Sequence, residues 1–271
     1  SSDVCSSDLK YAACAFAHFM EFGLQIRERD QYELKAADMG TVMHEALEKF
    51  SKKLQENGET WKTVTDDTRD RLIEECVEET MADYGNTIFQ SSSRNQYRII
   101  RVKRILKRTV WALQQQIRQG EFEPGEFEVS FSMEDSLSAI NIDLSEHEKM
   151  RLRGRIDRVD LCETDDKVYV KIIDYKTGNT SLDLVALYYG LQLQLAVYLD
   201  AAMELEQKKH PGKQVEPAGV FYYHIDDPML DQEEDETDEA WGRRMLKALR
   251  MDGLVNADRK VVELLDRVLE D

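Results

Sequence analysis

The sequence predicts a single α/β or α+β domain, because its hydrophobic pattern changes period along the chain. Up to about residue 119 the apolar residues recur at helical spacing. Two segments between residues 126 and 163 alternate apolar and polar residues as strands do, and a third, at 167–177, is rich in β-branched and aromatic residues. Another helical segment and another strand-like segment follow. Helices packed around a mixed sheet, with a helical segment at the N-terminal end, are therefore the expected architecture.

The N-terminal part of this domain is expected to be helical. Helices are predicted at residues 10–22, 38–57, 66–84 and 94–119, and Asp38 is expected to cap the second of them. That second helix places its large apolar side chains near one face: Val42, Leu47, Phe50 and Leu54. The fourth helix directs a comparable row inward: Ile99, Val102, Ile105, Leu106, Val110 and Leu113.

The strands are expected at residues 126–133, 150–163, 167–177 and 218–225. A helix is predicted from about Leu182 to Gln207, and two more at 239–250 and 258–270. We therefore divide the chain into a helical portion (10–125), a catalytic core (126–225), an acidic loop (226–239) and C-terminal helices (240–271). The repetitive segment 1–9 is expected to lie outside the fold.

Charge is unevenly distributed along the 271 residues, whose net charge is −18. Residues 226–239 hold nine acids and no base, while residues 91–120 hold eight Arg or Lys and no acid. The global charge therefore does not exclude a nucleic-acid partner, since binding depends on the local surface. No apolar run reaches the length of a membrane span. The four cysteines are scattered, which is typical of reduced thiols in a cytoplasmic protein.

The segment KVYVKIIDYKTGNTS ends a predicted strand with an acid and a base. Because side chains alternate along a strand, Asp174 and Lys176 share one face while Tyr175 points away. Asp157 stands near the end of the preceding strand, so a hairpin would bring the two carboxylates together. Neighbouring carboxylates persist when a cation lies between them, and Mg²⁺ prefers such oxygen ligands. An ordinary ion pair at a strand end is the alternative explanation.

Three further residues favour a site over a simple ion pair. His44 adds an imidazole on a predicted helix, and Gln194 and Tyr198 stand four residues apart on another helix, hence on one face. Each is weak evidence alone, since each could belong to ordinary packing. Their combination and order with Asp157 and Asp174 favour a catalytic centre.

The motifs G-x-x-x-H, G-x-x-D-R-x-D, D-Y-K-T-G and Q-L-x-x-Y occur here in an order that resembles the RecB-type branch of the PD-(D/E)XK nucleases. The resemblance implies a restriction-endonuclease-like core and Mg²⁺-dependent cleavage of phosphodiesters. By the same resemblance, Asp157, Asp174 and Lys176 are the central catalytic residues, with Gln194 and Tyr198 in support. The implied metal ligands are the side chains of His44, Asp157 and Asp174 and the carbonyl of Tyr175.

Flanking segments such as PAGVFYYHIDDP extend the resemblance over nearly the whole chain after residue 9, to the nuclease domain of the AddB family of helicase–nuclease subunits. It implies a DNA exonuclease that acts on single strands during double-strand break processing, with an AddA-like helicase–nuclease subunit as partner. The family also holds a [4Fe–4S] cluster, for which Cys14 matches the first ligand. Because no cysteine follows Cys162, we expect a chain truncated at its C-terminus.

Several alternatives stay open at this point. The basic helix at 94–118 could contact the DNA backbone, or its charges could simply be solvated. The acidic loop is expected to be solvent-exposed. A stand-alone RecB-like exonuclease and a catalytically inactive DNA-binding or scaffold module are the rival functions. The first is disfavoured by the AddB-like flanks, and the second by the presence of Asp157, Asp174 and Lys176 together.

Overall fold

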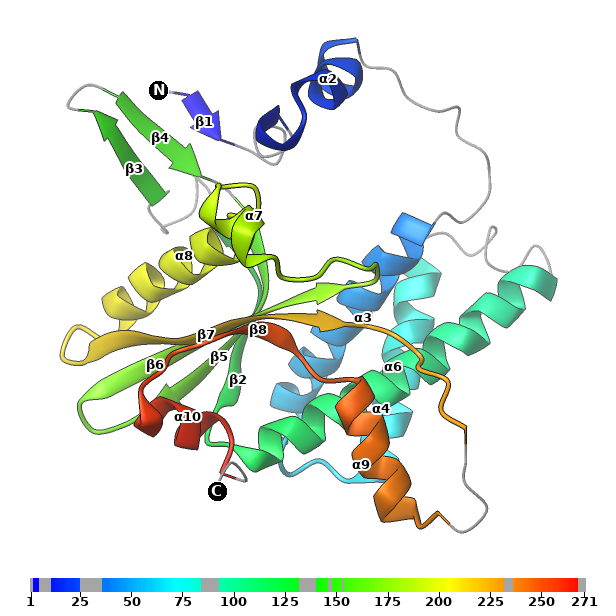
Figure 1. The fold of residues 1–271 in the computed structure, drawn as a ribbon. Helices are drawn as coiled ribbons and strands as arrows, with labels where there is room; N and C mark the ends of the chain where they lie inside the picture. The colour runs from blue at the N-terminus through cyan, green and yellow to red at the C-terminus, as the bar shows by residue number, and fades with distance from the viewer. Residues whose placement is uncertain are drawn as a thin grey trace.

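A five-stranded mixed sheet forms the centre of the structure, and helices lie on both of its faces (Figure 1). The computed structural model describes residues 2–4, 11–24, 36–83, 93–131, 140–145, 148–152, 154–231 and 236–267. The strand order is β2-β5-β6-β7-β8, with β6 and β7 parallel and the other neighbours antiparallel. The α/β expectation is confirmed. The strands are β2 (Glu123–Phe131), β5 (Gly154–Glu163), β6 (Lys167–Lys176), β7 (Gln214–His224) and β8 (Asp252–Val255).

A smaller three-stranded sheet lies beside the central one (Figure 1). It consists of β1 (Ser2–Val4), β3 (Ile140–Ser145) and β4 (Glu148–Leu152), in the order β1-β4-β3. β1 comes from the N-terminal segment that the sequence placed outside the fold, and it pairs in parallel with β4. The strand expected at 150–163 is thus divided between two sheets.

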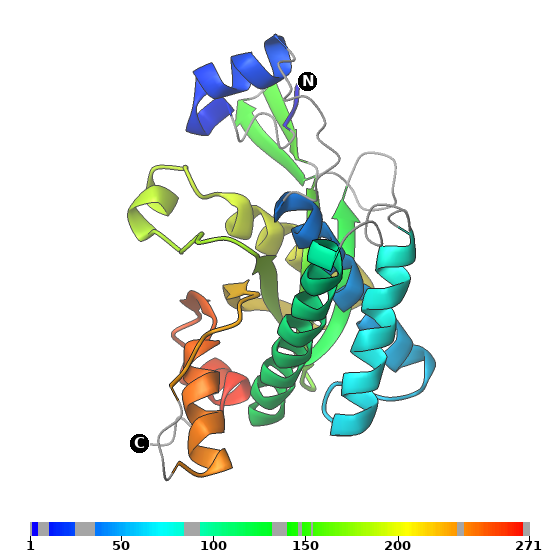
Figure 2. The same cartoon turned by 90° about the vertical axis from the view of Figure 1, so that its right-hand side faces the viewer.

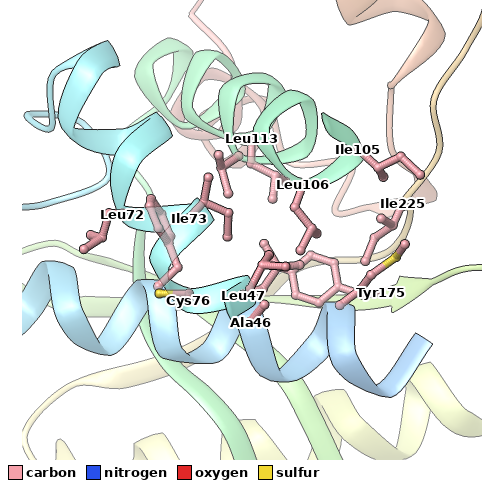
Figure 3. Packing of buried hydrophobic residues seen from close by; sticks show 14 of the residues in the cluster. Ala46, Leu47, Leu72, Ile73, Cys76, Ile105, Leu106, Leu113, Tyr175 and Ile225 are labelled. Carbon is pink, nitrogen blue, oxygen red and sulfur yellow. The ribbon is translucent and has the colours of Figure 1, made fainter. Parts of the chain in front are cut away.

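Three long helices cover one face of the central sheet. They are α3 (Ala36–Glu56), α4 (Asp66–Asp83) and α6 (Ser93–Gln119). Their apolar faces meet in one core together with side chains from β6 and β7, so Leu47, Leu106 and Tyr175 belong to the same cluster (Figure 3). The inward rows expected from the sequence are confirmed on both α3 and α6. Only Ile99 among them remains partly exposed.

The opposite face is covered by α8 (Gln194–Lys209), whose Leu195 and Ala202 pack on Ile172 and Val220. The other helices are short. They are α2 (Ala15–His18), the π-helix η1 (Phe19–Gly23), α7 (Leu184–Tyr188), α9 (Asp238–Ala248) and α10 (Arg259–Leu265). No helix in the described part of the chain is both long and apolar enough to cross a membrane.

Three details of the sequence prediction are wrong. The helix expected from Leu182 to Gln207 is two helices, because the chain turns at Gly190 with φ at 75°. Figure 2 shows the first of these, α7 in yellow-green, standing out from the body of the domain. Asp38 lies inside α3, which begins at Ala36, and is not its cap. Strand β8 falls in the stretch MDGLV, where the sequence pattern is too short to indicate a strand.

Buried charges connect β5 and β6 beneath the helices. The guanidinium of Arg158 donates to Asp160 from Nε at 2.5 Å and from a terminal nitrogen at 2.9 Å, and Lys171 Nζ lies 2.8 Å from the same carboxylate. Arg158 and Asp160 are fully buried. Burial alone would raise the pKa of Asp160, but Arg158 and Lys171 hold it below its usual range. Arg158 also donates to the Tyr175 hydroxyl at 3.4 Å, so this cluster supports the strand end that carries the site.

We predict that Asp160→Ala destabilises the fold by about 3–5 kcal/mol, because it leaves two buried cations without their carboxylate. The free energy of unfolding in urea measures this loss. Asp165→Ala, which removes an exposed carboxylate in the β5–β6 turn, is the matched control and should stay within about 0.5 kcal/mol of the unmodified chain. Equal stabilities of the two variants would contradict the structural role of Asp160.

Candidate active site

The site lies where β5 separates from β6. Their antiparallel pairing starts at Arg158, which stands opposite Ile173, and no earlier residue in the described part of β5 pairs with β6. Continued pairing would set Asp157 directly opposite Asp174, where like charges repel. Instead, the Tyr175 N–H donates to Asp157 Oδ2 at 2.7 Å. The two acids expected to meet at these strand ends are therefore both at the site.

Asp174, Lys176, Gln194 and Tyr198 form one hydrogen-bonded group. The Lys176 ammonium makes an ion pair with Asp174 Oδ2 and donates to Gln194 Oε1 at 3.2 Å. Gln194 Nε2 donates to Asp174 Oδ1 at 3.1 Å and to the Tyr198 hydroxyl at 2.9 Å. The Gln194 amide thus joins strand β6 to helix α8 and sets the direction of the ammonium. Asp174 and Lys176 share a face of β6, and Gln194 and Tyr198 share a face of α8, as expected.

His44 comes to the site from α3. Its Nδ1 lies 3.4 Å from Asp157 Oδ2, and its ring meets the Tyr175 ring edge to face at 5.8 Å between centroids. Tyr175 points into the helical core, away from Asp174 and Lys176, as the alternation along the strand predicted. Its ring therefore supports the imidazole while its backbone contributes to the site.

Glu128 is a site residue that the sequence analysis missed. The pairs Phe127–Arg158 and Val129–Ile156 set Glu128 across from Asp157 on β2. Its backbone has φ at 51°, uncommon for a residue with a side chain, and its carboxylate forms an ion pair with Arg155. One glutamate in the strand pattern EFEVSF gives no such signal by itself. Only the register between β2 and β5 identifies it.

The donor atoms at this point suit a divalent metal ion. His44, Glu128 and Asp157 each offer one possible ligand atom, and these atoms lie within 4.8 Å of one another. Asp174 Oδ2 is buried and makes an ion pair with the Lys176 ammonium. A carboxylate oxygen has two lone pairs, so Oδ2 can bind a cation while it contacts the ammonium. Carboxylates with an imidazole fit a magnesium- or manganese-type ion.

The electrostatics at Asp174 point the same way. Burial and the nearby Asp157 raise the pKa of its carboxyl to about 6, while Lys176 and His44 oppose the change. The carboxylate form is thus destabilised in the absence of a further positive charge. A cation between the two acids would relieve this cost.

Four of the eight basic residues of α6 form ion pairs with other described residues of the chain. Lys103 and Lys107 pair with Glu78 and Glu74 of α4, respectively. Arg104 and Arg108 both pair with Asp227. These contacts line a groove of about 640 Å³ between α4, α6 and α9. The sequence left two alternatives for this helix, a solvated face or a face that contacts DNA. In this part of α6 the charges are neither fully solvated nor free to bind DNA, because they are paired with acids of the chain.

The acidic loop is also partly packed. The side chain of Asp227 is only 8% exposed and that of Glu236 only 4%, and Glu236 pairs with Arg244 of α9 at 2.8 Å. The expectation of a solvent-exposed loop is wrong for these two residues, because Asp227 pairs with two arginines of α6 and Glu236 pairs with one of α9. Residues 232–235 lie outside the described part of the chain.

Cys14, the expected cluster ligand, is exposed and accepts a weak hydrogen bond from the Ala17 N–H as the N-cap of α2. Cys76 and Cys162 are buried in two different apolar clusters, and burial raises the pKa of both thiols. Cys5 lies outside the described residues. In the part of the chain that is described, Cys14 is thus the accessible thiol.

The arrangement of sheet, helices and site now defines the class of protein. A family model for the PD-(D/E)XK nuclease superfamily matches residues 6–270. The chain therefore belongs to that superfamily, and the fold expected from its motifs is confirmed. Nucleases of this superfamily use divalent metal ions, which agrees with the donor set at the strand ends.

Three curated relatives that the chain matches share one name. The chain is 49% identical over 257 residues to an ATP-dependent helicase/deoxyribonuclease subunit of Lachnoclostridium phytofermentans. It is 41% identical to the subunit of the same name from Alkaliphilus metalliredigens and 35% identical to the one from Clostridium tetani. These matches cover 95–96% of this chain but only 21–22% of each relative. The chain thus spans about a fifth of the length of the curated relatives that it matches.

We predict that Asp174→Asn stabilises the fold when divalent ions are removed. The folded pKa of about 6 exceeds the ordinary value of 3.8, so the native state binds more protons between these pH values and its stability falls as the pH rises through them. Asparagine resembles the protonated acid and avoids the loss, which amounts to about 3 kcal/mol above pH 6. Urea unfolding in EDTA at pH 4 and pH 8 measures the difference. A difference between variant and unmodified chain that does not grow with pH would contradict this account.

Proposed function

We propose that this chain is a Mg²⁺-dependent DNA exonuclease domain that hydrolyses phosphodiesters. The observation that carries the proposal is the group of Asp157, Asp174 and Lys176 where β5 separates from β6. Gln194 bonds to Asp174 and Lys176, and the Tyr175 N–H donates to Asp157. A structural ion pair between Asp174 and Lys176 would not need the second carboxylate, that of Asp157, beside it. That second carboxylate has a use in a metal-dependent centre.

His44, Asp157, Asp174 and the carbonyl of Tyr175 would hold the metal ion, and Glu128 is a further candidate. When bound, such an ion polarises a phosphate oxygen and lowers the pKa of a water molecule. The Asp157 carboxylate has a second task in the protein itself. By accepting the Tyr175 N–H, it fixes the backbone that carries Asp174 and Lys176.

Lys176 would orient the attacking water and stabilise the negative charge that grows on the phosphate. Its ammonium, held between Asp174 and Gln194, also lies 5.2 Å from the centre of the Tyr222 ring. These contacts restrict the ammonium to one position, which lowers the cost of aligning it in the transition state. Gln194 and Tyr198 act through Lys176 and Asp174 and are positioning residues.

The substrate and the assembly follow from the relatives' names, which give a helicase/deoxyribonuclease subunit. We infer that the domain degrades single strands released by unwinding, in an AddAB-type complex with an AddA-like helicase–nuclease subunit, during double-strand break repair in the cytoplasm. Cys14 is the candidate ligand of a [4Fe–4S] cluster. Its thiol is exposed, so it is accessible to a cluster whose other ligands are cysteines from elsewhere in the protein.

Degradation of labelled single-stranded DNA by the intact protein tests the proposed activity. Cleavage should require Mg²⁺ and should be lost in Asp174→Ala, because the carboxylate is part of both the ion pair and the donor set. Cleavage that persists in Asp174→Ala would assign the activity to another site. No cleavage by the folded unmodified protein would favour a binding module.

We predict that Lys176→Ala lowers the cleavage rate by at least about 10²–10³-fold, the usual effect of removing a group that stabilises transition-state charge. DNA binding, measured by fluorescence anisotropy, should change little, because the substrate's other phosphates keep their contacts. Lys167→Ala at the opposite end of β6 is the matched control and should cleave normally, since that ammonium pairs with Glu216 away from the site. Retained cleavage in Lys176→Ala would refute the assigned role.

A further inference from the structure

A second groove lies directly beside the site, on the other side of α6 from the groove of paired charges. It has a volume of about 330 Å³ and is bordered by α3, the start of α6 and the ends of β6 and β7. Thr177, which lines it, follows Lys176 in the chain. Met43, also in the lining, precedes His44. The groove is therefore lined by the immediate chain neighbours of Lys176 and His44, two residues of the proposed catalytic centre.

Its wall is apolar and its rim is charged. Met39, Met43, Val102, Ile105 and Ile225 form the wall, and the last four of these are at most 7% exposed. Arg98 and Arg101 belong to the rim. The lining residues of α6 share one face of the helix, because positions 98, 101, 102 and 105 follow helical spacing.

The charge at this rim is positive in a protein whose net charge is −18. Two arginines face one acid, Asp226, whose carboxylate accepts a hydrogen bond from the Asp227 N–H at 2.8 Å. Arg101 is exposed and has no ion pair with any of the residues that the structure describes. In the neighbouring groove, by contrast, the arginines are already bound to Asp227. A phosphate can meet Arg101 without displacing an acid.

Close contact between α3 and the turn after β6 keeps this groove next to the centre. A Cβ on Gly40 would lie 3.0 Å from Thr177 Oγ1, so glycine permits the close approach of the helix. Gly40 also precedes His44 by one helical turn. The same helix thus carries the wall of the groove and an imidazole of the site.

We propose that this groove binds one nucleotide of a single-stranded DNA next to the phosphate that is cleaved, with its base against the apolar wall and a neighbouring phosphate at Arg101. The inference rests on the proposed nuclease function and adds a substrate-binding site to it. The volume is at the lower end for small-ligand sites and suits one base rather than a base pair. An apolar surface contacts any base without regard to sequence, as degradation of a strand requires.

The phosphate contact is tested by binding a fluorescent oligothymidylate to the intact protein, with Ca²⁺ in place of Mg²⁺ to prevent cleavage. Arg101→Ala should bind about tenfold more weakly, as loss of a charged hydrogen bond predicts. The slope of log affinity against log salt should become shallower by about 0.7, the value for one single-strand phosphate. Arg101→Lys should keep the slope. Arg104→Ala, three residues along the same helix, is the matched control and should match the unmodified protein.

The base contact is tested with oligothymidylates that lack one thymine at successive positions. The unmodified protein should bind one of them more weakly than the others, and Met39→Asn, at the partly exposed edge of the wall, should lose this dependence on position while keeping the salt slope. An Arg101→Ala slope equal to that of Arg104→Ala, or equal binding of every abasic strand, would overturn the proposal. If the groove proposal fails in this way but Asp174→Ala still abolishes cleavage, the proposed nuclease function is retained. The failure of the groove proposal can therefore be distinguished from the failure of the nuclease proposal.

Discussion

The structure depends on the point at which β5 leaves β6. Up to Arg158 the two strands form an ordinary antiparallel ladder, and beyond it the Asp157 carboxylate takes the place of a backbone acceptor for the Tyr175 N–H. β6 continues to Lys176 because β7 supports its other edge in parallel register. At this end β5 is paired with β2 and β6 is paired with β7, but the described residues of the two strands are not paired with each other. Side chains from α3, β2 and α8 lie beside these strand ends and form the candidate site.

Where β5 and β6 are still paired, a cluster of buried charges holds the two strands in place. Asp160 binds Arg158 and Lys171, and Arg158 reaches the Tyr175 hydroxyl. Tyr175 is thus held by its hydroxyl on one side and by its N–H on the other. Because Tyr175 is held at both points, the positions of Asp174 and Lys176, which flank it in the chain, are fixed as well. The main effect of such a cluster is to specify one geometry. Its net contribution to the free energy of folding is small, because the attraction within a buried ion pair does little more than offset the cost of desolvating the charges.

The sequence predicted how several residues of the candidate site lie relative to one another, because these relations are local in the chain. Alternation along a strand set Asp174 and Lys176 on one face, and helical spacing set Gln194 and Tyr198 together. Glu128 could not be found this way, because its place opposite Asp157 depends on the register between two strands. The pairing of Arg104 and Arg108 with Asp227 joins residues about 120 positions apart and has no local signal. For the fold, long periodic helices were predicted well, whereas the break at Gly190 and the short strand β8 were not.

The central claim is that this strand separation creates a divalent-metal site. Binding of Mn²⁺ to the intact protein, measured by calorimetry, tests it most directly when the unmodified protein is compared with Asp157→Asn. Asparagine can still accept the Tyr175 N–H, so the fold is kept while a charged ligand is lost. The account predicts a loss of affinity greater than the roughly 10–100-fold that follows from losing a supporting hydrogen bond. Equal Mn²⁺ affinity in the two proteins would contradict it.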